Sequence, residues 1–170
     1  MKSLQTELKW ALIFAAMTLM WMTLERVAGL HGTNIHLHPM LTNLFAIPAI
    51  VVMILALRDK RRIAFDGAMT YKQGLLSGTL IALFIAILSP GTQWITSSLI
   101  SPHYFSNVIA YSVEMGYYPS AEAAAEYFNY KSYAIQSAVG ALVMGILTSA
   151  VAMIFLRSPT RSKWVTIHPQ

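Results

Sequence analysis

The chain has 170 residues, of which 56% are hydrophobic and only 11% are charged. Soluble domains carry about 25% charged residues, so this composition, with a mean hydropathy of +0.54, excludes an ordinary soluble fold and indicates a membrane protein. The absence of cysteine excludes disulfide frameworks and thiolate metal sites. The net charge of +5 does not indicate a nucleic-acid partner, because the basic residues flank apolar segments and do not line one soluble face.

The first apolar segment follows a short polar lead, Met1 to Lys9, and predicts a membrane span over about residues 10–30. At about 1.5 Å of rise per residue, this length is enough to cross a hydrocarbon core of about 30 Å. Glu25 falls near the outer edge of the span. We expect a turn-rich loop over 31–39 and a second span over about 40–57.

A basic segment, residues 57–62, follows the second span and predicts the orientation of the whole chain. An excess of Lys and Arg in short loops marks the cytosolic side of a membrane protein. The cations of this segment are also candidates for contacts with anionic lipid headgroups, although topology alone is the simpler interpretation. They are Arg58, Lys60, Arg61 and Arg62.

A third span is predicted over about residues 71–100. Thr70 and Gln73 have the spacing of a capping box, so we expect the helix to begin at Tyr71. The uncharged part of this segment exceeds the thickness of the hydrocarbon core, so we expect it to tilt, to kink or to emerge from the core. Ser89-Pro90-Gly91 is the expected break.

The longest connection separates the third span from the fourth and is rich in Tyr and Phe between Tyr104 and Tyr133. Aromatic residues gather at membrane interfaces, so we expect an interfacial helical segment here. Ser120 is the expected N-cap of an Ala-rich helix that runs through Tyr130 into a fourth span over about 133–156. Residues 158–170 form a basic tail.

These elements predict an all-α membrane protein with four transmembrane helices in a single domain, residues 1–157. Both termini and the tail are expected in the cytosol, with the interfacial segment between helices 3 and 4 on the extracytosolic side. Of the twelve Lys and Arg residues, ten fall on the predicted cytosolic side. Only Arg26 and Lys131 fall on the predicted outer side. The reverse topology would violate the positive-inside rule.

Small residues recur every fourth position in the third and fourth spans and predict a close helix–helix contact. The alternative is a contact between two copies of the chain. The two stripes are Gly74, Gly78, Ala82, Ala86 and Pro90, and Ser137, Ala141, Gly145 and Ser149.

Polar side chains near the predicted outer side form a candidate polar site, because ionisable groups inside a membrane are functional candidates by default. A His-x-His pair near a glutamate offers zinc donors, but its spacing matches no established metal motif, and loop histidines at an interface are commoner. We therefore predict no metal and no cofactor. The candidate residues are Glu25, His31, His36, His38, Gln93 and Gln136.

Five segments together resemble the bacterial membrane family named domain of unknown function 4199, over about Lys9 to Arg157. The resemblance implies an inner-membrane protein with four helices and no assigned activity, so no catalytic residues carry over. The segments are residues 24–31, 57–61, 67–74, 100–105 and 127–129.

We expect a non-enzymatic integral protein of the bacterial inner (cytoplasmic) membrane that serves as an accessory or scaffold subunit. Membrane lipids, a membrane protein or a second copy of the chain are the expected partners. One alternative is a small oligomeric transporter in which Glu25, Gln93 and Gln136 line an outward-open path. Another is a membrane enzyme that acts on a lipid-linked substrate, although no phosphate loop, nucleophile elbow or paired-carboxylate motif is present.

Overall fold

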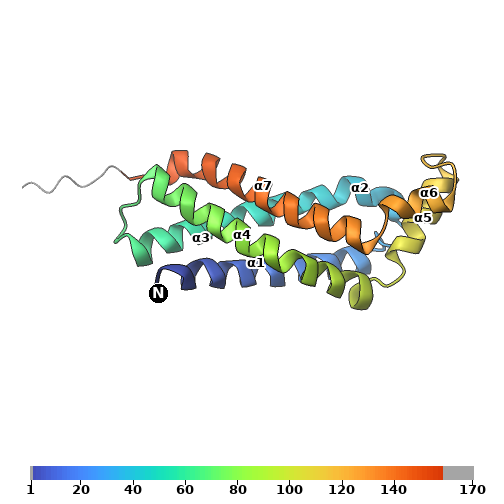
Figure 1. Cartoon of the computed structure of the whole chain (residues 1–170), viewed down its shortest axis with the longest axis horizontal. Coiled ribbons are helices and arrows are strands. Elements are labelled where there is room, and N and C mark those ends of the chain that lie inside the picture. The colour runs from blue at the N-terminus through green and yellow to red at the C-terminus, as the bar shows by residue number, and fades with distance from the viewer. Residues whose placement is uncertain (1, 159–170) are drawn as a thin grey trace, which may run out of the picture.

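The computed structural model describes residues 2–158, so the predicted tail beyond Ser158 lies outside the described residues. The described chain is helical and forms an elongated bundle of long helices (Figure 1). Four helical stretches are long and apolar enough to cross a membrane, which confirms the predicted class and number of spans. They are Leu4–Val27, Ile35–Ala64, Tyr71–Ile100 and Ala121–Leu156.

The bundle consists of four rods, two of which are built from several helical segments. The first rod is α1 (Lys2–Val27), and the second is made of η1 (Ile35–Leu37), α2 (His38–Leu41), η2 (Thr42–Phe45) and α3 (Ala46–Ala64). The third rod is α4 (Tyr71–Ile95) with the π-helical turn η3 (Thr96–Ile100), and the fourth is α7 (Tyr130–Leu156). Helices α5 (Tyr104–Glu114) and α6 (Ala121–Tyr127) lie between these two rods in the chain.

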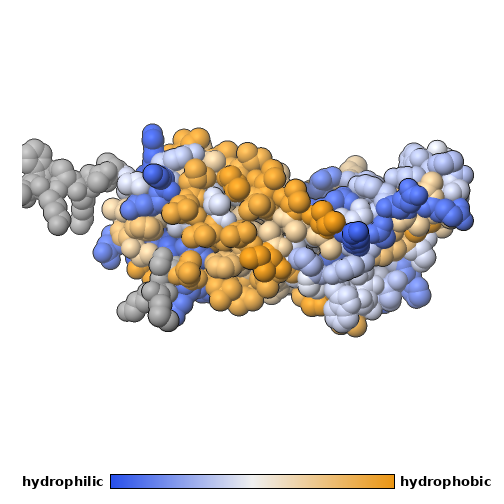
Figure 2. Space-filling view, in the orientation of Figure 1, coloured by the Kyte–Doolittle hydropathy of each residue, from blue (hydrophilic) through white to orange (hydrophobic). Residues whose placement is uncertain are grey.

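The two ends of the bundle differ in composition and in what covers them. Lys2, Ser158 and the α3–α4 connection share one end, which we call the basic end, and α5 and α6 cover the other, the capped end (Figure 1). Figure 2 shows one face of the bundle, on which an apolar belt lies between polar surfaces at both ends. This distribution matches a protein whose middle is solvated by hydrocarbon.

Helix α4 packs along α7 more extensively than any other pair of elements, and small residues allow the close approach. A Cβ atom at Gly78 would overlap the Ser149 side chain, and one at Gly145 would lie 2.5 Å from the Ala82 Cβ. Close backbone approach increases the dispersion contacts that drive helix association in lipid. The predicted contact between the two stripes is therefore confirmed within one chain.

The first helix begins earlier than predicted, because the polar lead is part of α1. Glu7 is buried, and its Oε1 lies 2.6 Å from the Lys60 Nζ. Two residues further, Lys9 donates to the Asp59 carboxylate at 2.7 Å. The apolar pattern alone predicts a start near residue 10, because the lead is polar. In the fold these charges pair with the basic segment of α3.

The second rod also begins earlier than predicted, because residues 35–39 of the expected loop are helical. The expected break at Ser89-Pro90-Gly91 is wrong as well, since α4 continues through Pro90 to Ile95. Proline is tolerated in membrane helices when neighbours satisfy the freed backbone groups. The carbonyl that Pro90 leaves without its helical donor is that of Ala86, and the Tyr130 hydroxyl adds a different bond from α7, to the Pro90 carbonyl, at 3.1 Å.

The caps at two helix starts are confirmed, and one junction differs from its prediction. Thr70 and Gln73 form the predicted capping box, and the Ser120 Oγ accepts from the Ala123 N–H. The Ala-rich helix does not continue into the fourth span, because α6 ends at Tyr127. Asn129 then caps α7 by accepting from the Ser132 N–H at 2.9 Å, a local bond that favours a new helix start.

Candidate functional site

Three residues of the candidate polar site, Glu25, His31 and His38, meet at the capped end of the bundle. The Nε2 of His31 lies 3.1 Å from the Glu25 Oε2, and the Nε2 of His38 lies 3.4 Å from the same oxygen. The other carboxylate oxygen, Oε1, accepts a hydrogen bond of 2.6 Å from the Trp21 indole. Glu25 and His31 are buried, and His38 is half-buried. The two imidazoles therefore converge on one carboxylate oxygen.

A tight turn after α1 brings His31 back over Glu25. Gly29 has a φ of +77°, and a Cβ there would lie 2.7 Å from the Thr33 Oγ1, so the turn requires glycine. The Leu30 N–H donates to the Glu25 carbonyl at 2.9 Å, which closes the turn. The helical turns that follow place His38 on the same side of the carboxylate.

Residues of the η3–α5 connection and of α5 contact the cluster, although they lie about 70 residues from His31 in the chain. The Ser101 Oγ lies 2.6 Å from the His31 Nδ1, and the Asn107 amide donates to the His31 carbonyl at 2.8 Å. The Tyr104 ring packs on both imidazoles, with centroid distances of 5.1 Å to His31 and 5.3 Å to His38. Burial raises the pKa of the Tyr104 phenol, so it stays protonated.

The other three residues of the candidate site do not join the cluster. His36 is exposed. Gln136 accepts from the Tyr127 hydroxyl at 3.0 Å and donates to the Ser132 hydroxyl at 2.9 Å, outside the bundle core. Gln93 lines a separate groove. Glu25, Gln93 and Gln136 therefore do not line one common path.

The four basic residues proposed as headgroup contacts also separate into different environments. Arg58 and Arg62 are exposed, and Arg61 donates to the Leu156 carbonyl at 3.0 Å. Lys60 is 1% exposed and ion-paired with Glu7, so its ammonium does not face a headgroup. The ion pair with Glu7 explains why Lys60 is buried while Arg58 and Arg62 are exposed, because a buried cation is retained only with a partner.

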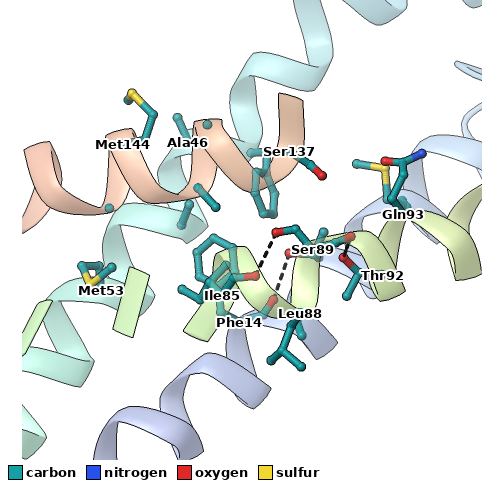
Figure 3. Close-up of a pocket in the computed structure, with 18 of the residues that line it drawn as sticks. Phe14, Ala46, Met53, Ile85, Leu88, Ser89, Thr92, Gln93, Ser137 and Met144 are labelled. Carbon is teal, nitrogen blue, oxygen red and sulfur yellow. Dashed lines mark hydrogen bonds between the residues drawn. The ribbon is translucent and has the colours of Figure 1, made fainter. Parts of the chain in front are cut away.

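A groove of about 430 Å³ lies between the four rods, on the capped side of the hydrophobic core (Figure 3). In the close-up, Met53 lies toward one end of the groove and Gln93 toward the other. Small residues leave this space open, because alanine and glycine line it on several helices. These small residues are Ala15, Ala46, Ala49, Gly140, Ala141 and Gly145.

The lining of this groove changes in polarity along the bundle. Toward the core it is apolar, with Phe14, Ile50, Met53, Ile85 and Met144. Toward the capped end it is polar, with Thr42, Asn43, Gln93, Thr96 and Ser137. Three rods contribute to this difference: the second rod with Thr42 and Asn43, α4 and η3 with Gln93 and Thr96, and α7 with Ser137, whereas Thr148 of α7 lines the part toward the core.

Most polar groups of the groove are satisfied by their own helix. The Thr96 and Ser137 hydroxyls donate to carbonyls of the preceding turn, and the Asn43 amide donates to the Pro39 carbonyl. Within residues 2–158, the Gln93 amide makes no side-chain hydrogen bond. A half-buried amide without a protein partner is available to a bound molecule.

Sequence reasoning missed Trp21 and Ser101, which hold the cluster in place. Trp21 precedes Glu25 by four residues, so helical spacing was a usable signal for this contact. No comparable signal existed for Ser101, which lies 70 residues from His31. The groove was missed for the same reason, because its walls come from four separate rods.

Comparison with known proteins identifies a family and no characterised relative. Residues 9–158 match the family model described as "Protein of unknown function (DUF4199)". The match spans the described bundle almost completely and confirms the resemblance seen in the sequence segments. No curated protein and no solved structure matches the chain.

Proposed function

We propose that this chain, which belongs to the DUF4199 family of proteins of unknown function, is a non-enzymatic accessory protein of the bacterial cytoplasmic membrane that holds an amphipathic lipid in its groove. The observation that carries this proposal is the polarity gradient of the groove. A hydrocarbon chain matches the apolar part near the core, and a hydrogen-bonding headgroup matches the polar part near the capped end.

The size and the opening of the groove support a lipid ligand. Its volume of about 430 Å³ falls within the range of about 300–1,000 Å³ that is typical of ligand sites. Asn43, Ala46 and Ile50 on the second rod and Met144 on α7 are exposed where they line the groove, which places an opening on the bilayer side. A lipid then enters from the bilayer and does not have to cross water.

The charge distribution supports an orientation for this ligand. The exposed Arg58 and Arg62 at the basic end favour a cytosolic position for that end. The capped end then faces outward, and the polar part of the groove lies toward the outer leaflet. A lipid of that leaflet would place its headgroup near Gln93 and its chain toward Met53.

The chemistry of the lining supports binding without catalysis. Among the described residues that line the groove, none is charged and none is histidine. General acid–base and nucleophilic catalysis need such groups in reach of the substrate. The transporter alternative has less support, because Glu25 and Gln136 lie outside the groove. A membrane protein or a second copy of the chain is the expected partner of an accessory subunit.

The proposal is tested by measuring the lipid that the protein retains. The full chain is purified in mild detergent, and lipid per chain is determined by mass spectrometry for wild type, Ala46→Trp and Ala16→Trp. Ala46 lines the groove, and Ala16 is exposed on α1 outside it. We expect wild type and Ala16→Trp to retain about one lipid per chain, and Ala46→Trp to retain several-fold less, because the indole fills the groove.

Two controls make this experiment decisive. Melting temperatures show whether Ala46→Trp is folded. Gln93→Leu tests the contact with the lipid headgroup and leaves the apolar part of the groove open for the hydrocarbon chain. We expect Gln93→Leu to retain lipid but with an altered distribution of headgroups. Equal retention by the two tryptophan variants, or no retained lipid in wild type, would refute the proposal.

A further inference from the structure

We propose that Glu25, His31 and His38 form a binding site for a zinc ion at the capped end of the bundle. The inference goes beyond the lipid groove and does not depend on it, since none of the three residues lines that groove. Two imidazoles and one carboxylate are a donor set that zinc takes in proteins, with the fourth position left to water or a substrate. The sequence alone led us to expect no metal, because the spacing of the three residues matches no established motif.

The distances between the donor atoms suit a tetrahedral ion. The Glu25 Oε2 lies 3.1 Å from the His31 Nε2 and 3.4 Å from the His38 Nε2. All three donor atoms lie within 4.8 Å of one another. With zinc–ligand bonds of about 2.0–2.1 Å, tetrahedral angles separate two ligand atoms by about 3.3–3.4 Å. An ion therefore fits among the three atoms after small side-chain shifts.

Contacts behind the donors hold them in the orientation that metal sites need. The Ser101 Oγ engages the His31 Nδ1 at 2.6 Å, which directs the Nε2 of that ring toward the cluster. The Trp21 indole occupies the Glu25 Oε1 and leaves Oε2 to face both imidazoles. Outer contacts of this kind fix ring orientation and ligand basicity in metal sites.

The site is shielded from bulk water but has an access route. Glu25 is 3% exposed and His31 is 7% exposed. A pocket of about 280 Å³, lined by Arg26, Ser101 and Tyr104 among others, reaches His31. The Tyr104 ring packs against both imidazoles, and a water molecule can supply the fourth ligand. This pocket borders the His31 side of the site, and the His38 side chain is 18% exposed, so the site is not sealed from solvent.

The competing explanation is a hydrogen-bonded cluster in which both imidazoles donate to the carboxylate. Absorption spectroscopy on the wild-type protein distinguishes the metal site from the hydrogen-bonded cluster, because only a metal site binds added Co²⁺ as a tetrahedral complex. The full chain, purified in detergent and stripped with EDTA, is titrated with Co²⁺ and then with Zn²⁺. We expect a visible absorption band at one Co²⁺ per chain and its loss when Zn²⁺ displaces the ion.

Variants then assign the site to its residues. Zn²⁺ affinity is measured by calorimetry for wild type, His38→Asn, Ser101→Ala and the control His36→Asn. His36 is exposed and lies two residues from His38. The same His→Asn change at this position therefore serves as a control that leaves the cluster intact. We expect at least a tenfold loss of affinity for His38→Asn, about a tenfold loss for Ser101→Ala, and no change for His36→Asn. Absence of the Co²⁺ band in wild type, or equal affinity in His38→Asn and His36→Asn, would overturn the proposal.

Discussion

The Glu25 carboxylate shows at the scale of one residue how a buried charge is retained near a membrane surface. It accepts from the Trp21 indole and faces both His31 and His38, so its oxygens are occupied by polar groups. Such bonds to a charged group contribute about 1.5–3 kcal/mol each, and an unsatisfied partner costs a comparable amount. The residue is therefore a structural anchor whatever ligand the site takes.

We expect Glu25→Gln to lower the melting temperature in detergent, by the equivalent of about 2 kcal/mol. The new amide nitrogen is a donor, and it would face either the indole N–H or an imidazole N–H. Glu25→Asp should restore only part of the loss, because its shorter side chain misplaces the oxygens. Thermal unfolding of the three proteins in metal-free buffer is the measurement. Identical curves for wild type and Glu25→Gln would show that the carboxylate has no structural role.

The Glu7–Lys60 pair leads to a second prediction at this scale. Both side chains are buried, and the Glu7 Oε2 has no hydrogen-bond partner among the described residues. Removal of one member of a buried pair leaves an uncompensated charge and costs about 3–5 kcal/mol. We expect Glu7→Leu to destabilise the protein by that amount, measured by denaturant unfolding in detergent. The double variant Glu7→Leu with Lys60→Met should recover most of the loss, and failure to recover would contradict this account.

At the scale of elements, the contact between α4 and α7 is the interaction most sensitive to side-chain volume. Gly78→Leu and Gly145→Leu should each lower the melting temperature, because the added atoms would push the two backbones apart. Overpacking of this kind costs about 1–3 kcal/mol. Leu83→Ile is the matched control, since Leu83 is 42% exposed and carries no such contact. Equal melting temperatures for the three variants would argue against the contact.

The comparison of sequence with structure is also clearest at this scale. Local patterns predicted the four apolar rods, the capping box at Thr70 and the small-residue contact of α4 with α7. Patterns failed where distant residues matter. The polar lead belongs to the bundle, where Glu7 pairs with Lys60, and α4 continues past Pro90 while packed along α7. The candidate site follows the same rule. Its residue types were visible, but only the fold shows which of them meet.

At the scale of the whole molecule, the testable property is the direction in which the bundle crosses the membrane. We expect both described ends on the cytosolic side, because exposed cations gather at the basic end. Single cysteines at Thr33 and Ser120 should react with an impermeant thiol reagent in intact cells. A cysteine at Ala64 should react only after lysis. Labelling at Ala64 but not at Thr33 in intact cells would reverse the topology.

The extensive contact between α4 and α7 has a consequence for how the protein is made. Helices α5 and α6 separate the two elements in the chain, so α1, α3 and α4 enter the bilayer before α7 is synthesised. During that interval the glycine-bearing face of α4 is turned toward lipid, because the helix that covers it does not yet exist. We therefore expect a stage with three rods during biogenesis, which the last rod would complete by lateral association within the bilayer.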